Sequence, residues 1–255
     1  LRSCCPHWPP TPFTATDSRR SALADRIQPR HDAHHSDPTP EISRLNQANT
    51  TDLSPGGLPR IEFWFDFASP YSYLAAMRIE QAAQQAGLGV AWKPMLLGPV
   101  FKSLGIPPLP LFAIPQKGEY IWKDLARQAD KFGLPWVQPS QFPRNGMLAE
   151  RIMAGDPDAP WTGAFCRAVF HRSWGLDQDI GTEEVIADAL REVGIDPGLA
   201  IARAGQDAAK LALRQQTEHA VALGIFGAPM MIARGELFWG NDRLDDAIAH
   251  AAGKQ

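Results

Sequence analysis

Residues 61–74, IEFWFDFASPYSYL, decide how we interpret the rest of the chain. Their first half alternates and is rich in aromatic side chains, which predicts a β-strand. Ser69 is a good helix N-cap, and Pro70 suits the first helical position, where an N–H has no backbone partner. Small and apolar residues then continue at helical spacing until Gly87, a typical helix end. This segment therefore predicts a strand that turns at Ser69 directly into a helix.

A second strand is predicted at residues 90–96, VAWKPML, and completes a strand–helix–strand unit. Two strands joined in this way run parallel, with a right-handed crossover. Residues 98–115 are studded with Gly and Pro and are expected to form a long loop. Residues 120–199 carry apolar faces at helical spacing, which indicates an all-helical insertion.

After the helical insertion, the sequence again predicts strands near the C-terminus. Residues 208–223 predict a helix, and residues 229–239, PMMIARGELFW, predict a β-hairpin with a glycine in its turn. Asn241 and Asp242 are expected to cap a last helix at residues 243–252. The chain thus alternates strands and helices around a helical insertion.

Residues 1–57 differ in composition from the rest of the chain. They are rich in Pro, Ser, Thr, Asp and His, so they cannot bury enough apolar surface, and we expect a disordered leader. His31, His34 and His35 could in principle bind a metal. No carboxylate or cysteine frame fixes a geometry there, so we interpret them as a solvated tail and expect no metal site.

Composition limits the classes of function. The 255 residues are 44% hydrophobic, which is enough for one sizeable core. A formal net charge of −3 gives no electrostatic reason to expect nucleic acid or an anionic membrane as partner. No stretch approaches the roughly 20 apolar residues that span a bilayer. The chain contains no Cys-x-x-Cys motif among its three cysteines, Cys4, Cys5 and Cys166, which favours a reducing compartment. Cys166 is expected to be buried and to pack as a small apolar residue. We expect a soluble, cytoplasmic protein.

The turn at Ser69 is suited to hold an anion. The first N–H groups of a helix have no backbone partner, and the helix dipole favours negative charge there. The Ser69 hydroxyl adds a donor, and such donors lower the pKa of a thiol. The chain has no cysteine in this turn, so the thiol would come from a ligand; alternatively, Ser69 is only an N-cap.

If the bond between Ala228 and Pro229 is cis, the resulting bend leaves the Ala228 carbonyl and N–H free to pair with a peptide-like ligand.

Five stretches carry a resemblance: FDFASPYSYL (residues 65–74), KPMLLGPVFK (93–102), PQKGEY (115–120), GIFGAP (224–229) and FWGNDRL (238–244). Together they resemble the 2-hydroxychromene-2-carboxylate isomerase family and the related kappa-class glutathione transferases, both related to DsbA oxidoreductases. The resemblance covers roughly residues 60–250. It implies an α/β fold in which a thioredoxin-like domain, residues 58–97 and 206–252, is interrupted by a loop and an all-α insertion, residues 98–205. It also implies a homodimer.

The same resemblance implies a glutathione site. Ser69 is similar to the family serine that hydrogen-bonds the glutathione sulfur and keeps it as a thiolate. Ala228 matches the residue before the family's cis-proline, here Pro229, whose backbone pairs with the cysteinyl part of glutathione.

Three further positions match residues that hold the ends of glutathione. Asn241 and Asp242 match the pair at the γ-glutamyl end, and Lys117 matches the lysine that meets the glycyl carboxylate. Without the resemblance, the preferred interpretation of Asn241 and Asp242 is that they are helix caps, and that of Lys117 is a solvated surface charge. Ile106 departs from the family, which often places there an asparagine that contacts glutathione, and this bears on the glycyl-end contacts and on the substrate.

The resemblance implies a glutathione-dependent isomerase with a small aromatic substrate. The thiolate adds reversibly to the conjugated bond of a hydroxybenzylidenepyruvate, so that the adduct can rotate before the ring closes and the thiolate leaves. Tyr71, Phe101, Phe112 and Trp136 are candidate pocket walls, although each is also explained as a core aromatic. The alternatives are a kappa-type glutathione transferase or peroxidase, a disulfide oxidoreductase and a non-catalytic glutathione-binding protein. The absence of cysteine at residues 69–72 argues against the oxidoreductase.

Overall fold

The structure is a computed structural model, and it describes residues 57–254. The expected leader, apart from Gly57, lies outside the described residues, and so does the cluster of His31, His34 and His35.

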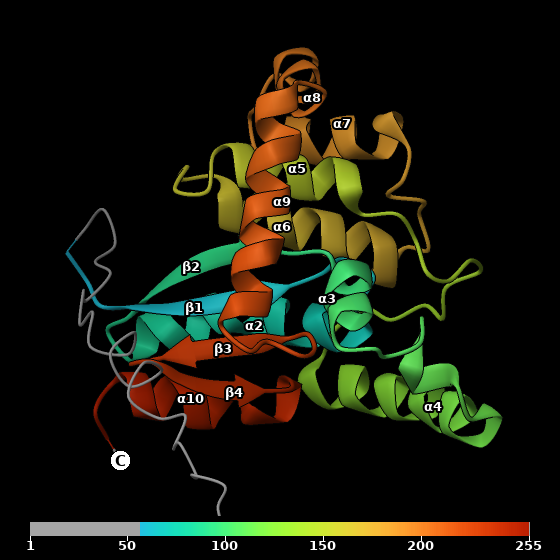
Figure 1. Ribbon diagram of the computed structural model, residues 1–255, viewed down its shortest axis with the longest axis vertical. Helices are drawn as coiled ribbons and strands as arrows, with labels where there is room; N and C mark the ends of the chain where they lie inside the picture. The colour runs from blue at the N-terminus through green and yellow to red at the C-terminus, as the bar shows by residue number, and fades with distance from the viewer. Residues whose placement is uncertain (1–56, 255) are drawn as a thin grey trace, which may run out of the picture. The chain divides into compact units, whose positions relative to one another are not determined.

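A four-stranded mixed sheet forms the centre of the described region (Figure 1). Its strands are β1 (Arg60–Phe65), β2 (Gly89–Pro94), β3 (Met230–Ala233) and β4 (Glu236–Trp239), in the order β2-β1-β3-β4. β2 runs parallel to β1 and is joined to it by helix α2 (Pro70–Gln85), whereas β3 is antiparallel to both β1 and β4. The predicted strand–helix–strand unit and the predicted hairpin are both confirmed.

Alternation along β1 sends its side chains into two apolar cores. Phe63 and Phe65 pack on one face of the sheet, with α2 and with α10 (Leu244–Ala251). Trp64 points to the other face, where it packs with residues of α9 (Asp207–Ala222), which crosses the strands in Figure 1. Because neighbouring residues of a strand face opposite sides, one aromatic segment supplies both cores.

The region between β2 and α9 is helical. It contains α3 (Leu97–Ser103), η1 (Pro110–Phe112), α4 (Pro115–Phe132), α5 (Met147–Gly155), α6 (Thr162–Phe170), the π-helical turn η2 (His171–Gly175), α7 (Glu183–Glu192) and α8 (Pro197–Ala204). α6 packs on α2, and α5 packs on α8 and α9. The insertion is therefore held against both flanking parts of the chain, and the domain bounds at residues 98 and 205 stay a prediction.

Two expectations about local structure were wrong. Part of the expected long loop is the helix α3, because Pro99 lies in its first turn, where proline is tolerated, and Val100 is buried beside α9. Asn241 and Asp242 do not cap the last helix. They lie in a short 3-10 turn, η3 (Asn241–Arg243), and Arg243 is the N-cap of α10.

The hairpin turn between β3 and β4 has a simple stereochemical basis. Arg234 and Gly235 have φ angles of 50° and 83°, so both central residues are left-handed. This is the pattern of a type I′ turn, whose twist matches that of the flanking strands. No helix among residues 57–254 has both the length and the apolar character needed to cross a membrane.

Candidate functional site

Ser69 and Ala228 meet at the start of α2. Ser69 is the N-cap of this helix, and its Oγ accepts a hydrogen bond from the Ser72 N–H at 3.2 Å, as the sequence predicts. The same hydroxyl donates to the carbonyl oxygen of Ala228 at 3.0 Å. The peptide bond between Ala228 and Pro229 is cis. Two stretches that lie 159 residues apart in the chain are thus joined through one hydroxyl.

The backbone of Ala228 is only half available to a ligand. Its carbonyl was expected to be free, and this was wrong, because the carbonyl accepts the Ser69 proton. Within the described part of the chain, nothing accepts a hydrogen bond from the Ala228 N–H. The Pro229 carbonyl accepts from the Gly240 N–H at 3.0 Å, which ties this bend to the turn that carries Asn241.

Asn241 is buried and bound to α2. Its Oδ1 accepts a hydrogen bond from Arg78 at 2.5 Å, and the Arg78 guanidinium also lies 3.7 Å from the centre of the Phe132 ring. Arg78 therefore fixes the position of Asn241 relative to α2 and α4.

Asp242 is exposed, and its carboxylate pairs with Arg243 at 3.0 Å. Its charge reaches the start of α2. Burial and the nearby Asp124 carboxylate raise the pKa of Tyr71, and the charge of Asp242 adds to this shift. A negative charge thus lies close to the helix start that carries Ser69.

Lys117 lies in the first turn of α4 and is exposed. Among residues 57–254 its side chain has no ion-pair or hydrogen-bond partner. Asp124 follows two turns later on the same helical face, about 10 Å further along the axis. The Tyr71 hydroxyl donates to the Asp124 carboxylate at 3.0 Å, which fastens this face of α4 to the start of α2.

Two buried carboxyl groups lie behind the Ser69 turn, and the sequence analysis gave them no role. Asp66 accepts hydrogen bonds from the N–H groups of Ala68 and Leu97, both at 2.7 Å. Glu150 of α5 accepts from the Phe67 N–H at 3.4 Å. Burial raises the pKa of both carboxyl groups, and the charge of Asp66 raises that of Glu150 further. An acidic residue within an apolar helix face, as at position 150, is the signal that could have revealed the burial of Glu150.

Two of the four expected pocket-wall aromatics pack on other aromatic side chains. Trp136 stacks on Trp174 with ring centres 5.8 Å apart, and Phe112 packs on Trp122 and Phe142, both at 5.0 Å. Tyr71 and Phe101 are half-buried. The structure thus gives these side chains a packing role, and their contact with a substrate stays a prediction.

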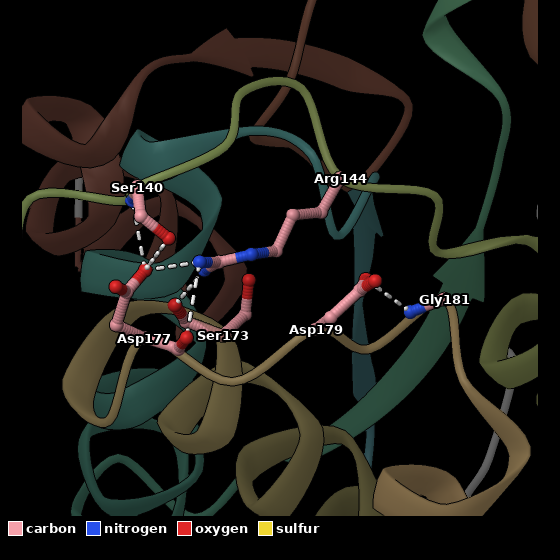
Figure 2. A network of polar contacts seen from close by, with 6 residues as sticks. All are labelled: Ser140, Arg144, Ser173, Asp177, Asp179 and Gly181. Carbon is pink, nitrogen blue, oxygen red and sulfur yellow. Dashed lines mark hydrogen bonds and ion pairs between the residues drawn. The ribbon is translucent and has the colours of Figure 1, made fainter.

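A polar network holds the segment that supports the Ser69 turn. Figure 2 shows the buried Arg144 guanidinium between the Ser173 carbonyl and the Asp177 carboxylate, to both of which it donates. The Ser140 N–H donates to the same carboxylate at 2.9 Å. Trp174, next to Ser173, donates from Nε1 to the Phe67 carbonyl at 3.1 Å. The insertion therefore contacts the segment before Ser69 through Trp174, and the bond from Arg144 to the neighbouring Ser173 carbonyl holds the Trp174 backbone in place.

Comparisons with known proteins agree with this architecture. Residues 60–250 match the family model of the DSBA-like thioredoxin domain. The chain is 31% identical over 186 residues to a 2-hydroxychromene-2-carboxylate isomerase of Sphingobium xenophagum, covering 72% of this chain and 94% of the relative. It is 28% identical over 198 residues to glutathione S-transferase kappa 2 of Caenorhabditis elegans, covering 72% and 88%.

A solved structure of a 2-hydroxychromene-2-carboxylate isomerase superposes with a TM-score of 0.70 at 29% identity, covering 76% of this chain and 95% of that one. The thioredoxin-like α/β fold is confirmed. The chain therefore belongs to the DsbA-like thioredoxin-domain family and, within it, to the family of the 2-hydroxychromene-2-carboxylate isomerases.

Proposed function

We propose that this protein is a glutathione-dependent isomerase that interconverts 2-hydroxychromene-2-carboxylate and trans-o-hydroxybenzylidenepyruvate. One observation carries the proposal: the Ser69 hydroxyl, at a helix start, lies 3.0 Å from the Ala228 carbonyl oxygen. A donor for a sulfur anion and a backbone edge for a peptide therefore occupy the same place. The isomerases and transferases among its relatives support an enzyme of this kind.

Glutathione fits the polar groups around this point. Its sulfur would lie at Ser69, and the unused Ala228 N–H would donate to the cysteinyl carbonyl. The Asp242 carboxylate has the charge to receive the γ-glutamyl ammonium, next to the Asn241 turn. Lys117 has the charge to receive the glycyl carboxylate from α4. Opposite charges at the two ends of the peptide would fix its direction in the site.

The chemistry requires a thiolate and a place to hold it. The thiolate forms a carbon–sulfur bond with the conjugated double bond of the substrate, which becomes an enolate with a single bond at that position. After rotation, the carbon–sulfur bond breaks, the double bond re-forms with cis geometry, and the phenol oxygen closes on the ketone while its proton passes to the ketone oxygen. Ser69 and the first N–H groups of α2 stabilise the thiolate before attack and after departure.

A second candidate is a kappa-type glutathione transferase, which the match to the Caenorhabditis elegans enzyme favours. It would use the same thiolate but leave the electrophile conjugated. The small aromatic substrate, a homodimer and a cytoplasmic location are further parts of the proposal, and they rest on the family resemblance.

The proposal is tested by titrating the full chain with glutathione and following thiolate absorbance near neutral pH. Wild type should develop this absorbance and catalyse isomerisation of o-hydroxybenzylidenepyruvate. Ser69→Ala should lose the absorbance and about a hundredfold in kcat, as expected when one donor to a developing anion is removed. Ser72→Ala is the matched control, because the Ser72 hydroxyl is buried without a hydrogen-bond partner among residues 57–254. Retention of both signals in Ser69→Ala would refute a catalytic role, and conjugation of a halogenated arene without isomerisation would favour the transferase.

A further inference from the structure

The turn that presents Ser69 is held from behind by Asp66. This residue is 7% exposed, and each of its carboxyl oxygens accepts a short backbone hydrogen bond, from Ala68 and from Leu97, at 2.7 Å. The Ser69 N–H donates to the Asp66 carbonyl at 2.9 Å. Two charge-stabilising donors make Asp66 the member of the carboxyl pair that is suited to carry a negative charge.

Glu150 approaches the same place from the insertion. Glu150 lies on α5 and is 1% exposed, and its carboxyl group lies within hydrogen-bonding reach of the Asp66 carboxyl group. Its Oε1 accepts from the Phe67 N–H, while its Oε2 is buried and has no hydrogen-bond partner among residues 57–254. Two carboxylates cannot donate to each other, so a bond between them requires one proton. A proton on Oε2, donated to Asp66, would give this buried oxygen a partner.

Gly146 leaves the room for this arrangement. A Cβ at this position would lie 2.8 Å from the Phe67 Cβ and 3.3 Å from the Glu150 Oε1. A residue with a side chain would therefore press on the carboxyl group and on the turn together. The absence of a side chain at Gly146 therefore lets the Glu150 carboxyl group approach the turn that carries Ser69.

The groups around Glu150 favour its neutral form. Besides Asp66, they are Cys166 on α6 and Arg151, the next residue on α5. Burial, followed by the charge of Asp66, raises the pKa of Glu150, and the opposing effect of Arg151 is smaller. Burial raises the pKa of the Cys166 thiol well above its ordinary value, so Cys166 adds no charge.

We propose that Glu150 is a positioning residue for the reaction: it keeps its proton at neutral pH and donates it to the Asp66 carboxylate. The inference rests on the proposed role of Ser69 in holding a thiolate. The shared proton has two consequences. It fastens α5 of the insertion to the turn that aims the Ser69 hydroxyl, and it keeps a second negative charge from the back of a site that must stabilise an anion.

Loss of that proton would act on catalysis from a distance. An ionised Glu150 would repel Asp66 in a buried setting, and the added charge would oppose thiolate formation. The rate should therefore fall at alkaline pH in wild type. In the Glu150→Gln variant, the side-chain amide would still donate to Asp66 but would not titrate, whereas Glu150→Met would offer similar bulk with no donor.

The proton is observed directly by infrared spectroscopy of the full chain without glutathione. Wild type should show the carbonyl band of a protonated carboxylic acid at neutral pH, and Glu150→Gln should remove this band. Asp66→Asn should leave a protonated-acid band in place. The proposal is overturned if wild type lacks the band or if Glu150→Gln retains it. This measurement decides the protonation of Glu150 even if the protein shows neither a glutathione thiolate nor isomerisation, an outcome that would refute only the proposed function.

The functional part is read from pH profiles of kcat/KM and of thiolate absorbance. Glu150→Gln should stay within about twofold of wild type at neutral pH and lose the alkaline fall that wild type shows. Glu150→Met should lose about tenfold at neutral pH, because Asp66 then loses the proton that Glu150 donates to it and keeps only its two backbone donors. Glu184→Gln, on the exposed start of α7, is the matched control and should follow wild type throughout. The positioning role is overturned if Glu150→Gln and Glu150→Met lose the same factor in kcat/KM. It is also overturned if Glu150→Gln keeps the alkaline fall of wild type. If Glu150→Met does not fold, the pH profile of Glu150→Gln alone decides.

Discussion

The hydroxyl of Ser69 donates its only proton to the carbonyl oxygen of Ala228, at 3.0 Å. A sulfur anion beside Ser69 must therefore compete with this carbonyl for the proton. A peptide thiol can end the competition, because its own amide N–H can replace the hydroxyl at the Ala228 carbonyl and release it towards sulfur. A thiol without an amide has no such replacement to offer.

The first prediction compares two thiols at saturating concentration. Bound glutathione should show a thiol pKa at least about one unit below the usual value near 8.5, whereas 2-mercaptoethanol should stay close to it. The measurement is ultraviolet thiolate absorbance as a function of pH, with Ser69→Ala as the reference for a missing donor. Equal ionisation of the two thiols in wild type would show that the Ala228 carbonyl does not control the hydroxyl.

The second prediction concerns the charge of Asp242. Replacement by Asn should weaken glutathione binding about fivefold, the upper range for an exposed ion pair. Calorimetry with glutathione and with its analogue lacking the γ-glutamyl amino group forms a double-mutant cycle, since the analogue should bind wild type and Asp242→Asn equally. Asp130→Asn, exposed on α4, is the control for loss of one negative charge. If the analogue is as sensitive to the substitution as glutathione, Asp242 does not meet the ammonium.

Local chemistry made much of this structure predictable, and long-range packing limited the rest. The cap at Ser69 and the Arg234–Gly235 turn follow from side-chain donors and backbone angles within a few residues. The prediction that Asn241 caps a helix was wrong because its side chain accepts a hydrogen bond from Arg78, 163 residues away, and is not left to cap the helix. The approach of Ser69 to Ala228 was expected only through the family resemblance.

The pairing of Asp66 with Glu150 could not be predicted, because nothing local shows that Asp66 is the group that meets the buried Glu150. Both residues are common surface types, and only the packing of α5 behind the turn makes them a buried pair. The same holds for the aromatic side chains beside Trp174, whose mutual contacts depend on where the insertion lies.

The third prediction concerns Arg144, the centre of the network in Figure 2. Arg144→Met should lower the unfolding temperature by about 5 °C, because it leaves the Ser173 carbonyl and the Asp177 carboxylate without their charged donor. It should also reduce kcat more than it raises the KM for the aromatic substrate, since Trp174 would support the Phe67 turn less firmly. Arg191→Met is the control, because the Arg191 pair with Asp188 is exposed on both sides and should contribute little. Equal melting of the two variants would mean that the network does not stabilise the insertion.

The fourth prediction is the pH dependence of stability. Burial, and after it the charge of Asp66, raise the pKa of Glu150 well above its ordinary value of 4.5, so the folded protein keeps a proton that the unfolded chain releases. The unfolded state then binds fewer protons, and the contribution of Glu150 to the free energy of unfolding falls as pH rises from about 4.5, by up to about 1.4 kcal/mol per pH unit. Glu150→Gln cannot titrate, so its stability relative to wild type should improve as the pH rises above about 4.5 in urea unfolding. Glu184→Gln should show no such trend, because the exposed Glu184 keeps its contact with water. Parallel curves for wild type and Glu150→Gln would mean that Glu150 ionises in the folded state as readily as in the unfolded one, and that no proton is held between it and Asp66.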